Sequence, residues 1–126
     1  MTRLAAATLA ISLTLSLPVA AQSVVEGEFP AGAGISFEQF HAAIAPKLAA
    51  PETAQYKRLL LVDGPQGPTI CGWMNSVVDG NTTSDHPLLH VIGNGQTIVF
   101  PNFNPDDLFG AVDTGILEGT GCGPIL

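Results

Sequence analysis

Two cysteines, Cys71 and Cys122, constrain the possible folds of this chain more than any other feature of its sequence. Neither belongs to a CxxC pair, and neither has a Lys, Arg or His within a few residues to lower its pKa, so redox or metal chemistry is the less favoured use. Bonded to each other, they would stabilise the fold by about 4 kcal/mol, because the bond restricts the unfolded chain. A disulfide of this kind needs an oxidising compartment.

The N-terminal segment is typical of a secretory signal peptide. Arg3 is followed by an uncharged run over residues 4–17 that is too short to span a membrane, and small residues precede Gln22. The alternative is an uncleaved anchor, but Ser and Thr side chains dilute the run and Pro18 disfavours a longer helix. We therefore expect residues 1–21 to be cleaved. The mature protein is then expected in the periplasm or secreted, with no membrane attachment.

The charge of the chain excludes one large class of function. There are 4 Lys and Arg residues against 11 Asp and Glu, a formal net charge of −7, and cleavage after residue 21 would also remove Arg3. A nucleic-acid-binding protein needs a basic face, which so few cations cannot form, and anionic membrane surfaces are disfavoured for the same reason. With 46% hydrophobic and 12% charged residues, the chain is expected to fold as one small domain.

The order of sequence patterns predicts an α+β fold. Residues 22–35 contain three glycines and a proline without a sustained period and are predicted to be a flexible leader, so the domain would comprise residues 36–126. Ser36 and Gln39 have the spacing of a capping box, and Phe37, Phe40 and Ile44 then form one apolar helix face. Pro46 is expected to end this helix.

Strand and turn signals fill most of the remaining sequence. We predict strands over 58–62, 69–78, 88–92 and 97–100, joined in two hairpins by turns rich in Gly, Pro and Asn. A short helix is expected to begin near Asn104, with Leu108, Phe109 and Val112 facing the sheet. The predicted architecture is a single antiparallel sheet of about four strands, with the N-terminal helix and the short C-terminal helix packed on one face.

Part of the sequence resembles a known group of proteins. The segments 48–56 (LAAPETAQY) and 71–75 (CGWMN), together with Cys122, resemble small exported bacterial proteins that carry a DPxSAxF-like segment, a CGEVN-like motif and a C-terminal Cys. In this chain Trp73 and Met74 stand where that group has Glu and Val. The group has no assigned activity, so the resemblance implies export and a disulfide and nothing about chemistry.

The segment from Asp79 to His90 contains the strongest candidates for a metal site. Oxygen-bearing side chains alternate from Asp79 to Asp85 as in a calcium loop, but Ser84 replaces the glycine and His90 the glutamate that such a loop requires. His86 and His90 could bind a transition metal on a helix. The surrounding residues predict a strand, however, in which they would lie about 13 Å apart. Asp79, Asp85, His86 and His90 therefore remain weak candidates, and no cofactor is expected.

No arrangement of residues indicates a catalytic site. Ser84, Asp85 and His86 are adjacent in sequence, whereas a catalytic triad brings its members from separate elements, and there is no Gly-x-Ser-x-Gly elbow. Our leading hypothesis is an exported, non-enzymatic accessory protein that binds another protein or a small ligand. The alternative is a metal-binding or hydrolytic domain that uses residues 79–90. Trp73 is a weak candidate for a binding anchor, and core packing against the first helix is its alternative role.

Overall fold

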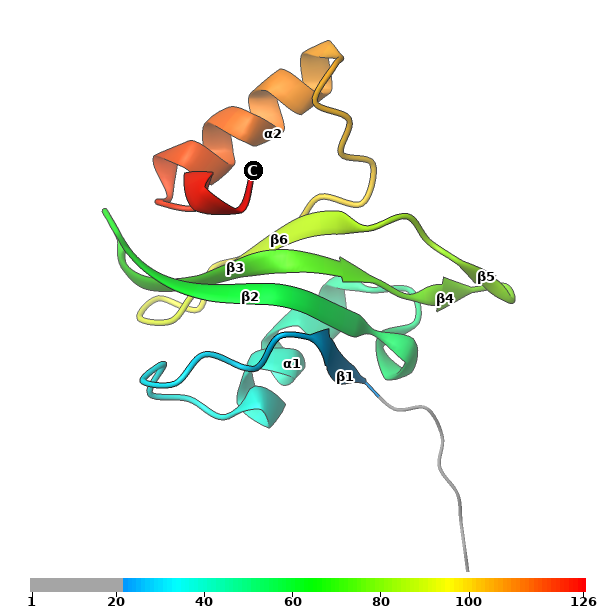
Figure 1. Ribbon diagram of the computed structural model, residues 1–126, viewed down its shortest axis with the longest axis horizontal. Helices are drawn as coiled ribbons and strands as arrows, with labels where there is room; N and C mark the ends of the chain where they lie inside the picture. The colour runs from blue at the N-terminus through cyan, green and yellow to red at the C-terminus, as the bar shows by residue number, and fades with distance from the viewer. Residues whose placement is uncertain (1–21) are drawn as a thin grey trace, which may run out of the picture.

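A five-stranded sheet forms the centre of the protein (Figure 1). The computed structural model describes residues 22–126, and the predicted signal peptide, residues 1–21, lies outside the described residues. The strand order is β1-β2-β3-β6-β7, with β1 parallel to β2 and all other neighbours antiparallel. The strands are β1 (Ser23–Glu26), β2 (Gln55–Gly64), β3 (Gly67–Asn75), β6 (His86–Val91) and β7 (Thr97–Val99).

The prediction of a single small α+β domain with a mostly antiparallel sheet is confirmed. The two predicted hairpins correspond to β2–β3 and β6–β7. The polar loop between β3 and β6 forms an additional two-stranded hairpin of β4 (Val77–Val78) and β5 (Asn81–Thr82). The part of the chain that the structure describes contains no helix that is long and apolar enough to cross a membrane.

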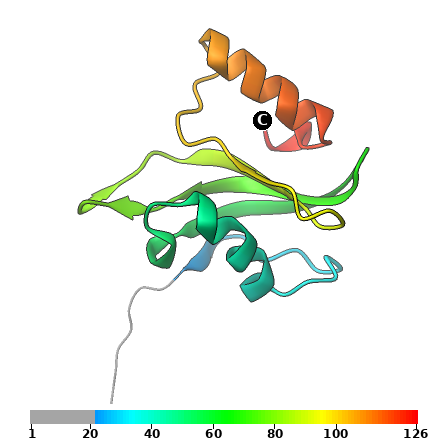
Figure 2. The same cartoon turned by 180° about the vertical axis from the view of Figure 1, so that it is seen from behind.

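The two α-helices lie on opposite faces of the sheet, so the prediction that both pack on one face is wrong (Figures 1 and 2). The helices are α1 (Phe37–Ile44) and α2 (Leu108–Gly119). The reason lies in the alternation along β3, which is apolar on both faces. Ile70 and Met74 belong to the core on the α1 side, whereas Cys71 belongs to the core on the α2 side. A sheet that is apolar on both faces needs a cover on each.

The α1 layer contains the larger hydrophobic core. Phe40 and Ile44 of α1 are fully buried against Tyr56, Met74 and Leu88 of the sheet. The predicted capping box is present, because Ser36 Oγ accepts from Gln39 N and Gln39 Oε1 accepts from Ser36 N. The helix ends at Ile44, two residues before Pro46. Two 3₁₀ turns, η1 (Ala45–Lys47) and η2 (Pro51–Thr53), lead into β2.

The structure differs from the flexible leader expected for residues 22–35. Ser23–Glu26 forms β1, which pairs in parallel with the start of β2 and places Ser23 N 3.1 Å from Ala54 O. Further along, Ala33 is buried, and the Phe29 ring lies 5.6 Å from the Phe40 ring between centroids. The many turn residues obscured a short β-branched run, Val24-Val25, whose position at the sheet edge is set by tertiary packing.

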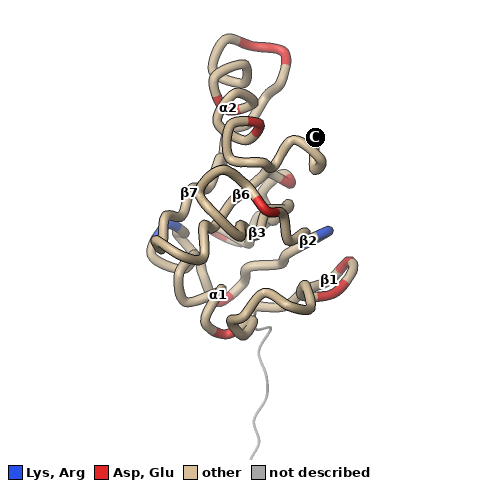
Figure 3. The backbone as a smooth tube through the Cα atoms, turned by 90° about the vertical axis from the view of Figure 1, so that its left-hand side faces the viewer, with Lys and Arg blue, Asp and Glu red and all other residues tan. Residues whose placement is uncertain are grey.

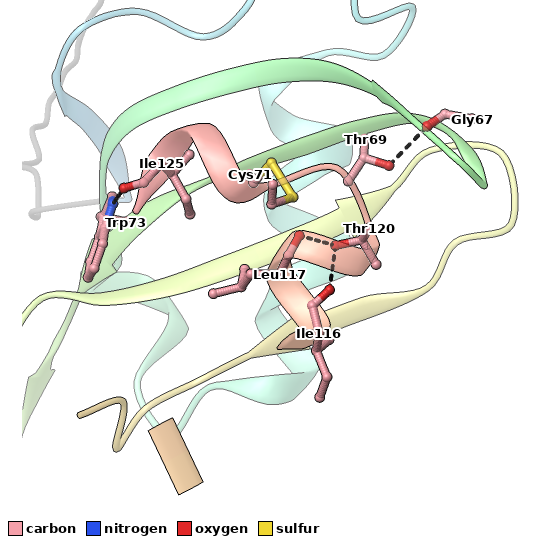
Figure 4. The surroundings of a disulfide bond; sticks show 9 residues. Gly67, Thr69, Cys71, Trp73, Ile116, Leu117, Thr120 and Ile125 are labelled. Carbon is pink, nitrogen blue, oxygen red and sulfur yellow. Dashed lines mark hydrogen bonds between the residues drawn. A yellow bond between two sulfur atoms is a disulfide. The ribbon is translucent and has the colours of Figure 1, made fainter. Parts of the chain in front are cut away.

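The α2 layer is smaller and is closed by a disulfide (Figure 4). Cys71 on β3 is bonded to Cys122, which follows α2, as the sequence predicted, and their Cα atoms are 5.9 Å apart. A short 3₁₀ helix, η3 (Gly123–Ile125), follows the bond. The buried cluster beneath α2 consists of six residues: Cys71, Leu89, Val91, Phe100, Leu117 and Cys122.

Candidate functional site

The two histidines of the predicted metal segment do not come together. Both lie on β6 and on the same face, but Leu88 stands between them, and four residues along a strand span about 13 Å. His86 Nδ1 lies 2.9 Å from Ser84 O, and His90 Nδ1 lies 2.8 Å from Thr97 Oγ1, so each ring has its own local partner. Within residues 22–126, no three His, Cys, Asp or Glu side chains form a group that could hold a metal ion.

The two aspartates of this segment have different structural surroundings. Asp79 and Gly80 form the tight turn of the β4–β5 hairpin, with φ angles of 52° and 79°. Asp85 lies elsewhere and accepts hydrogen bonds from Asn75 Nδ2 at 2.9 Å and from Lys57 Nζ at 3.1 Å. The hydrogen bond from Asn75, helped by Lys57, holds the pKa of Asp85 below its ordinary value. The alternating oxygens that suggested calcium therefore belong to a turn and to an interstrand bridge.

Trp73 lies on the α2 side of the sheet, so the expectation that it packs against the first helix is wrong. Its Nε1 donates to Ile125 O at 3.0 Å (Figure 4), and its ring centroid is 6.0 Å from that of Phe103. The Arg58 guanidinium lies 5.6 Å from the ring centroid, at a point where an irregularity in β2 gives Arg58 a positive φ. Trp73 thus holds the η3 segment in place. Its exposed part borders a pocket of about 280 Å³ that Phe103, Pro105, Thr114 and Leu126 complete.

The residues of α2 that were expected to face the sheet face solvent instead. Leu108, Phe109 and Val112 are 77%, 76% and 56% exposed, and Ile116 is 37% exposed. These four side chains, which we call the apolar face of α2, follow one side of the helix at spacings of three and four residues, with Phe109 beside Leu108. The contact with the body of the protein is made by Gly110 and Leu117, which are buried.

Gly110 allows the preceding loop to pack closely against the first turn of α2. The loop that precedes α2 folds back over the first turn of the helix, and a Cβ atom on Gly110 would collide with the carbonyl oxygen of Asn104. Asp107 caps the helix, its Oδ1 accepting from Gly110 N at 2.7 Å. In Figures 1 and 2 the C-terminal end of α2 lies nearer the sheet than its N-terminal end, which the loop of residues 100–107 connects to the sheet.

A groove of about 550 Å³ lies between α2 and the edge strand β7. Ile98 and Val99 line it from β7, and Phe109 and Ile116 line it from the apolar face of α2. Two carboxylates, Asp107 and Asp113, stand at its wall. The remaining lining residues belong to the loop after β7: Phe100, Pro101 and Asn102.

The charged residues of α2 and its flanking segments are all acidic. Asp106, Asp107, Asp113 and Glu118 lie on or beside α2, and no Lys or Arg follows Arg58 in the sequence. Figure 3 shows acidic positions on and around α2 and the basic positions confined to the sheet and the α1 side. Sequence reasoning missed this groove. The signal was present in the apolar positions 108, 109, 112 and 116, but the same pattern also fits a helix that packs on a sheet.

Comparisons with protein families, with curated proteins and with solved structures found no match to this chain.

Proposed function

We propose that this protein is an exported, non-enzymatic accessory domain that binds another protein through the apolar face of α2. The observation that carries the proposal is the exposure of Leu108, Phe109, Val112 and Ile116 side by side on one helix. Single exposed apolar residues are ordinary, whereas a contiguous apolar patch with a polar rim marks an interaction surface. Burial of such side chains is the main source of binding energy in protein interfaces.

Charge complementarity indicates the chemistry of the partner. The groove beside the apolar face is bordered by Asp107 and Asp113, and among the described residues its lining contains no Lys or Arg; on this face of the sheet Arg58 lies over the Trp73 ring, outside the groove lining. An apolar partner surface that carries Lys or Arg at its rim would therefore be attracted and correctly oriented. A second copy of this chain would bring the same carboxylates together, and an anionic membrane would be repelled.

Export is supported by two independent features. The N-terminal pattern is that of a cleaved signal peptide. The bond between Cys71 and Cys122 is compatible with an oxidising compartment. The resemblance of segments 48–56 and 71–75 to small exported bacterial proteins agrees with this location. We accordingly expect the partner to be a protein of the periplasm or the cell exterior.

No specific observation favours a metal-binding or hydrolytic function for residues 79–90. His86, His90 and Asp85 each have a nearby partner within the fold. The third histidine, His41, shares a hydrogen bond with the buried Tyr56 hydroxyl, 2.7 Å away.

The proposal is tested by capture of a partner from the periplasmic or secreted fraction with the immobilised mature domain. The Leu108→Ser/Val112→Ser variant should lose the captured protein, while Val25→Ser, at an exposed apolar position on β1, the opposite edge of the sheet from β7, should retain it. Capture should also weaken as the salt concentration is raised from about 0.05 M to about 0.5 M, because salt screens the attraction between exposed charges. Equal capture by the wild type and the α2 variant would refute the proposed surface.

A further inference from the structure

We infer that the partner segment binds in an extended conformation, adding a strand to the free edge of β7 and placing its apolar side chains in the groove beneath α2. This inference rests on the proposed function and specifies how the same surface recognises its partner. It identifies the ligand as a short extended peptide segment with apolar residues at alternate positions and with Lys or Arg beside them.

The backbone of β7 has an unused hydrogen-bonding edge. Among residues 22–126, β7 is the last strand of the sheet and pairs only with β6. Gln96 O accepts from Val91 N at 2.8 Å, and Phe100 N donates to Pro87 O at 3.0 Å, so the backbone of residues 96 and 100 points toward β6. Because successive residues of a strand point their N–H and C=O groups to opposite sides, those of Thr97 and Val99 point outward.

The two edges of the sheet are protected to different degrees. The β1 edge has a register irregularity between Val24 and Glu26, and Glu26 lies 3.8 Å from Arg58 as an ion pair. Irregularities, charges and very short strands are among the means by which proteins prevent strand addition. β7, with the sequence Thr97-Ile98-Val99, is protected only by its short length, because it has neither a charge nor a proline. The edge next to the groove is thus the one that is chemically open to another strand.

The groove lies where every second side chain of an added strand would point. Side chains of a strand alternate between the two faces of a sheet. Ile98 packs with the core on the α2 side, so a neighbouring strand would direct alternate residues toward α2 as well. There they would meet Phe109 and Ile116, with Asp113 in position for a Lys or Arg. Main-chain hydrogen bonds would supply affinity, and the groove would supply specificity, as in other cases of strand addition.

The test uses synthetic peptides and fluorescence anisotropy. The probe is a labelled eight-residue peptide of alternating Val and Lys. Two further versions carry backbone N-methyl groups, one on every Val and one on every Lys. A fourth peptide has Glu in place of Lys, and a fifth is basic with apolar residues at helical spacing. We expect the alternating basic peptide to bind, the Glu peptide not to bind, and only one of the two N-methylated peptides to lose at least about tenfold in affinity, because only one edge of the added strand pairs with β7.

Protein variants provide a second, independent measurement. Val99→Pro removes the outward N–H while leaving the ladder to β6 intact, and Val99→Ala removes a similar amount of side chain but keeps the N–H. Val99→Pro should weaken binding of the alternating peptide at least about tenfold relative to Val99→Ala. If Val99→Pro fails to fold by circular dichroism, the N-methylated peptides decide the question alone.

The remaining outcomes separate this inference from the proposed function. If both N-methylated peptides bind equally, or the helical peptide binds instead, while Leu108→Ser/Val112→Ser still abolishes binding, then strand addition is wrong and the α2 surface stands. A concentration-dependent dimer that Val99→Pro abolishes would make a second copy the occupant and overturn the inference. If no basic peptide binds and capture is insensitive to the α2 variant, both the inference and the proposed function are wrong.

Discussion

His41 is partly buried and His90 is buried, and each ring has a hydroxyl partner, Tyr56 for the first and Thr97 for the second. Burial lowers the pKa of both imidazoles from the ordinary value of 6.5, because a charged ring loses its hydration. Burial of Tyr56 raises the pKa of its phenol well above 10. All three groups are therefore neutral in the folded protein at neutral pH, and the hydrogen bonds join uncharged partners.

The histidines make stability depend on pH. Their pKa values are lower in the folded chain than in the unfolded chain, so proton binding favours the unfolded state. The contribution of the two neutral histidines to the free energy of unfolding is therefore complete above pH 6.5 and is lost as the pH falls below that value. We expect the free energy of unfolding, measured in urea, to be smaller at pH 5 than at pH 7.5. The His41→Gln/His90→Gln variant should show a weaker dependence over the same range, and an unchanged slope would contradict this origin.

Asp85 is predicted to be structural. Asn75 Nδ2 donates to Asp85, and Asn75 Oδ1 has no hydrogen bond in the described residues, so Asp85→Ala would leave the whole buried amide without a partner. We expect this substitution to lower the free energy of unfolding by about 1 to 3 kcal/mol. Asp85→Asn keeps an acceptor for Asn75 and loses only the half-exposed ion pair with Lys57, so it should cost less. Chemical denaturation of both variants checks this order, which a metal-ligand role for Asp85 would not explain.

At the scale of single elements, α2 divides its apolar residues between two tasks. Leu117 is fully buried against the sheet, whereas the apolar face is exposed. We expect Leu117→Ala to lower the free energy of unfolding by about 2 to 5 kcal/mol, because it leaves a cavity in the small core beneath α2. Leu108→Ser/Val112→Ser should change stability by less than about 1 kcal/mol, since each surface change is worth about 0.5 kcal/mol or less. Thermal and urea denaturation would show the contrast, and comparable losses would mean that the apolar face is part of the core.

Elements with local signals could be predicted from the sequence, whereas their arrangement in space could not. The capping box at Ser36, the two hairpins and the start of α2 depend on nearby residues and were predicted correctly. β1 was missed because its pairing with β2 is not local. The groove was missed because a helix with an apolar stripe looks the same whether a sheet or a partner covers it. In the structure Gly110 and Leu117, not the apolar stripe, face the body of the protein.

At the scale of the whole molecule, the two layers are held to the sheet by different means. The α1 layer depends on a core of fully buried aromatic and aliphatic side chains, among them Phe40 and Tyr56. The α2 layer has fewer buried side chains and is joined to β3 by the disulfide. Gly64 of the β2–β3 hairpin also approaches the Thr120 carbonyl so closely that a Cβ atom would collide with it.

Removal of the disulfide should therefore affect the α2 layer most. We expect Cys71→Ala/Cys122→Ala to lose about 4 kcal/mol of unfolding free energy by the chain-entropy argument. Hydrogen exchange should show greater loss of protection in α2 and η3 than in α1. Uniform loss of protection in all three helical segments would contradict the separate anchoring of the two layers.

Intact-mass spectrometry of exported material tests the sequence-based assignment of residues 1–21. We expect a mature chain that begins at Gln22 and is two hydrogens lighter than the reduced form, because Cys71 and Cys122 are bonded. Retention of Met1, or thiols that react with an alkylating reagent without reductant or denaturant, would contradict export and oxidation.

Because Leu108, Phe109 and Val112 are exposed, we expect substitutions at these positions to cost the fold little. Mutations at these positions escape the selection that protects the interior, where even one lost methylene is felt. Such a helix can drift toward new binding preferences while the sheet beneath it stays intact. A few substitutions on one and a half turns of α2 would therefore change which partner is bound, while the fold of the rest of the chain stays the same.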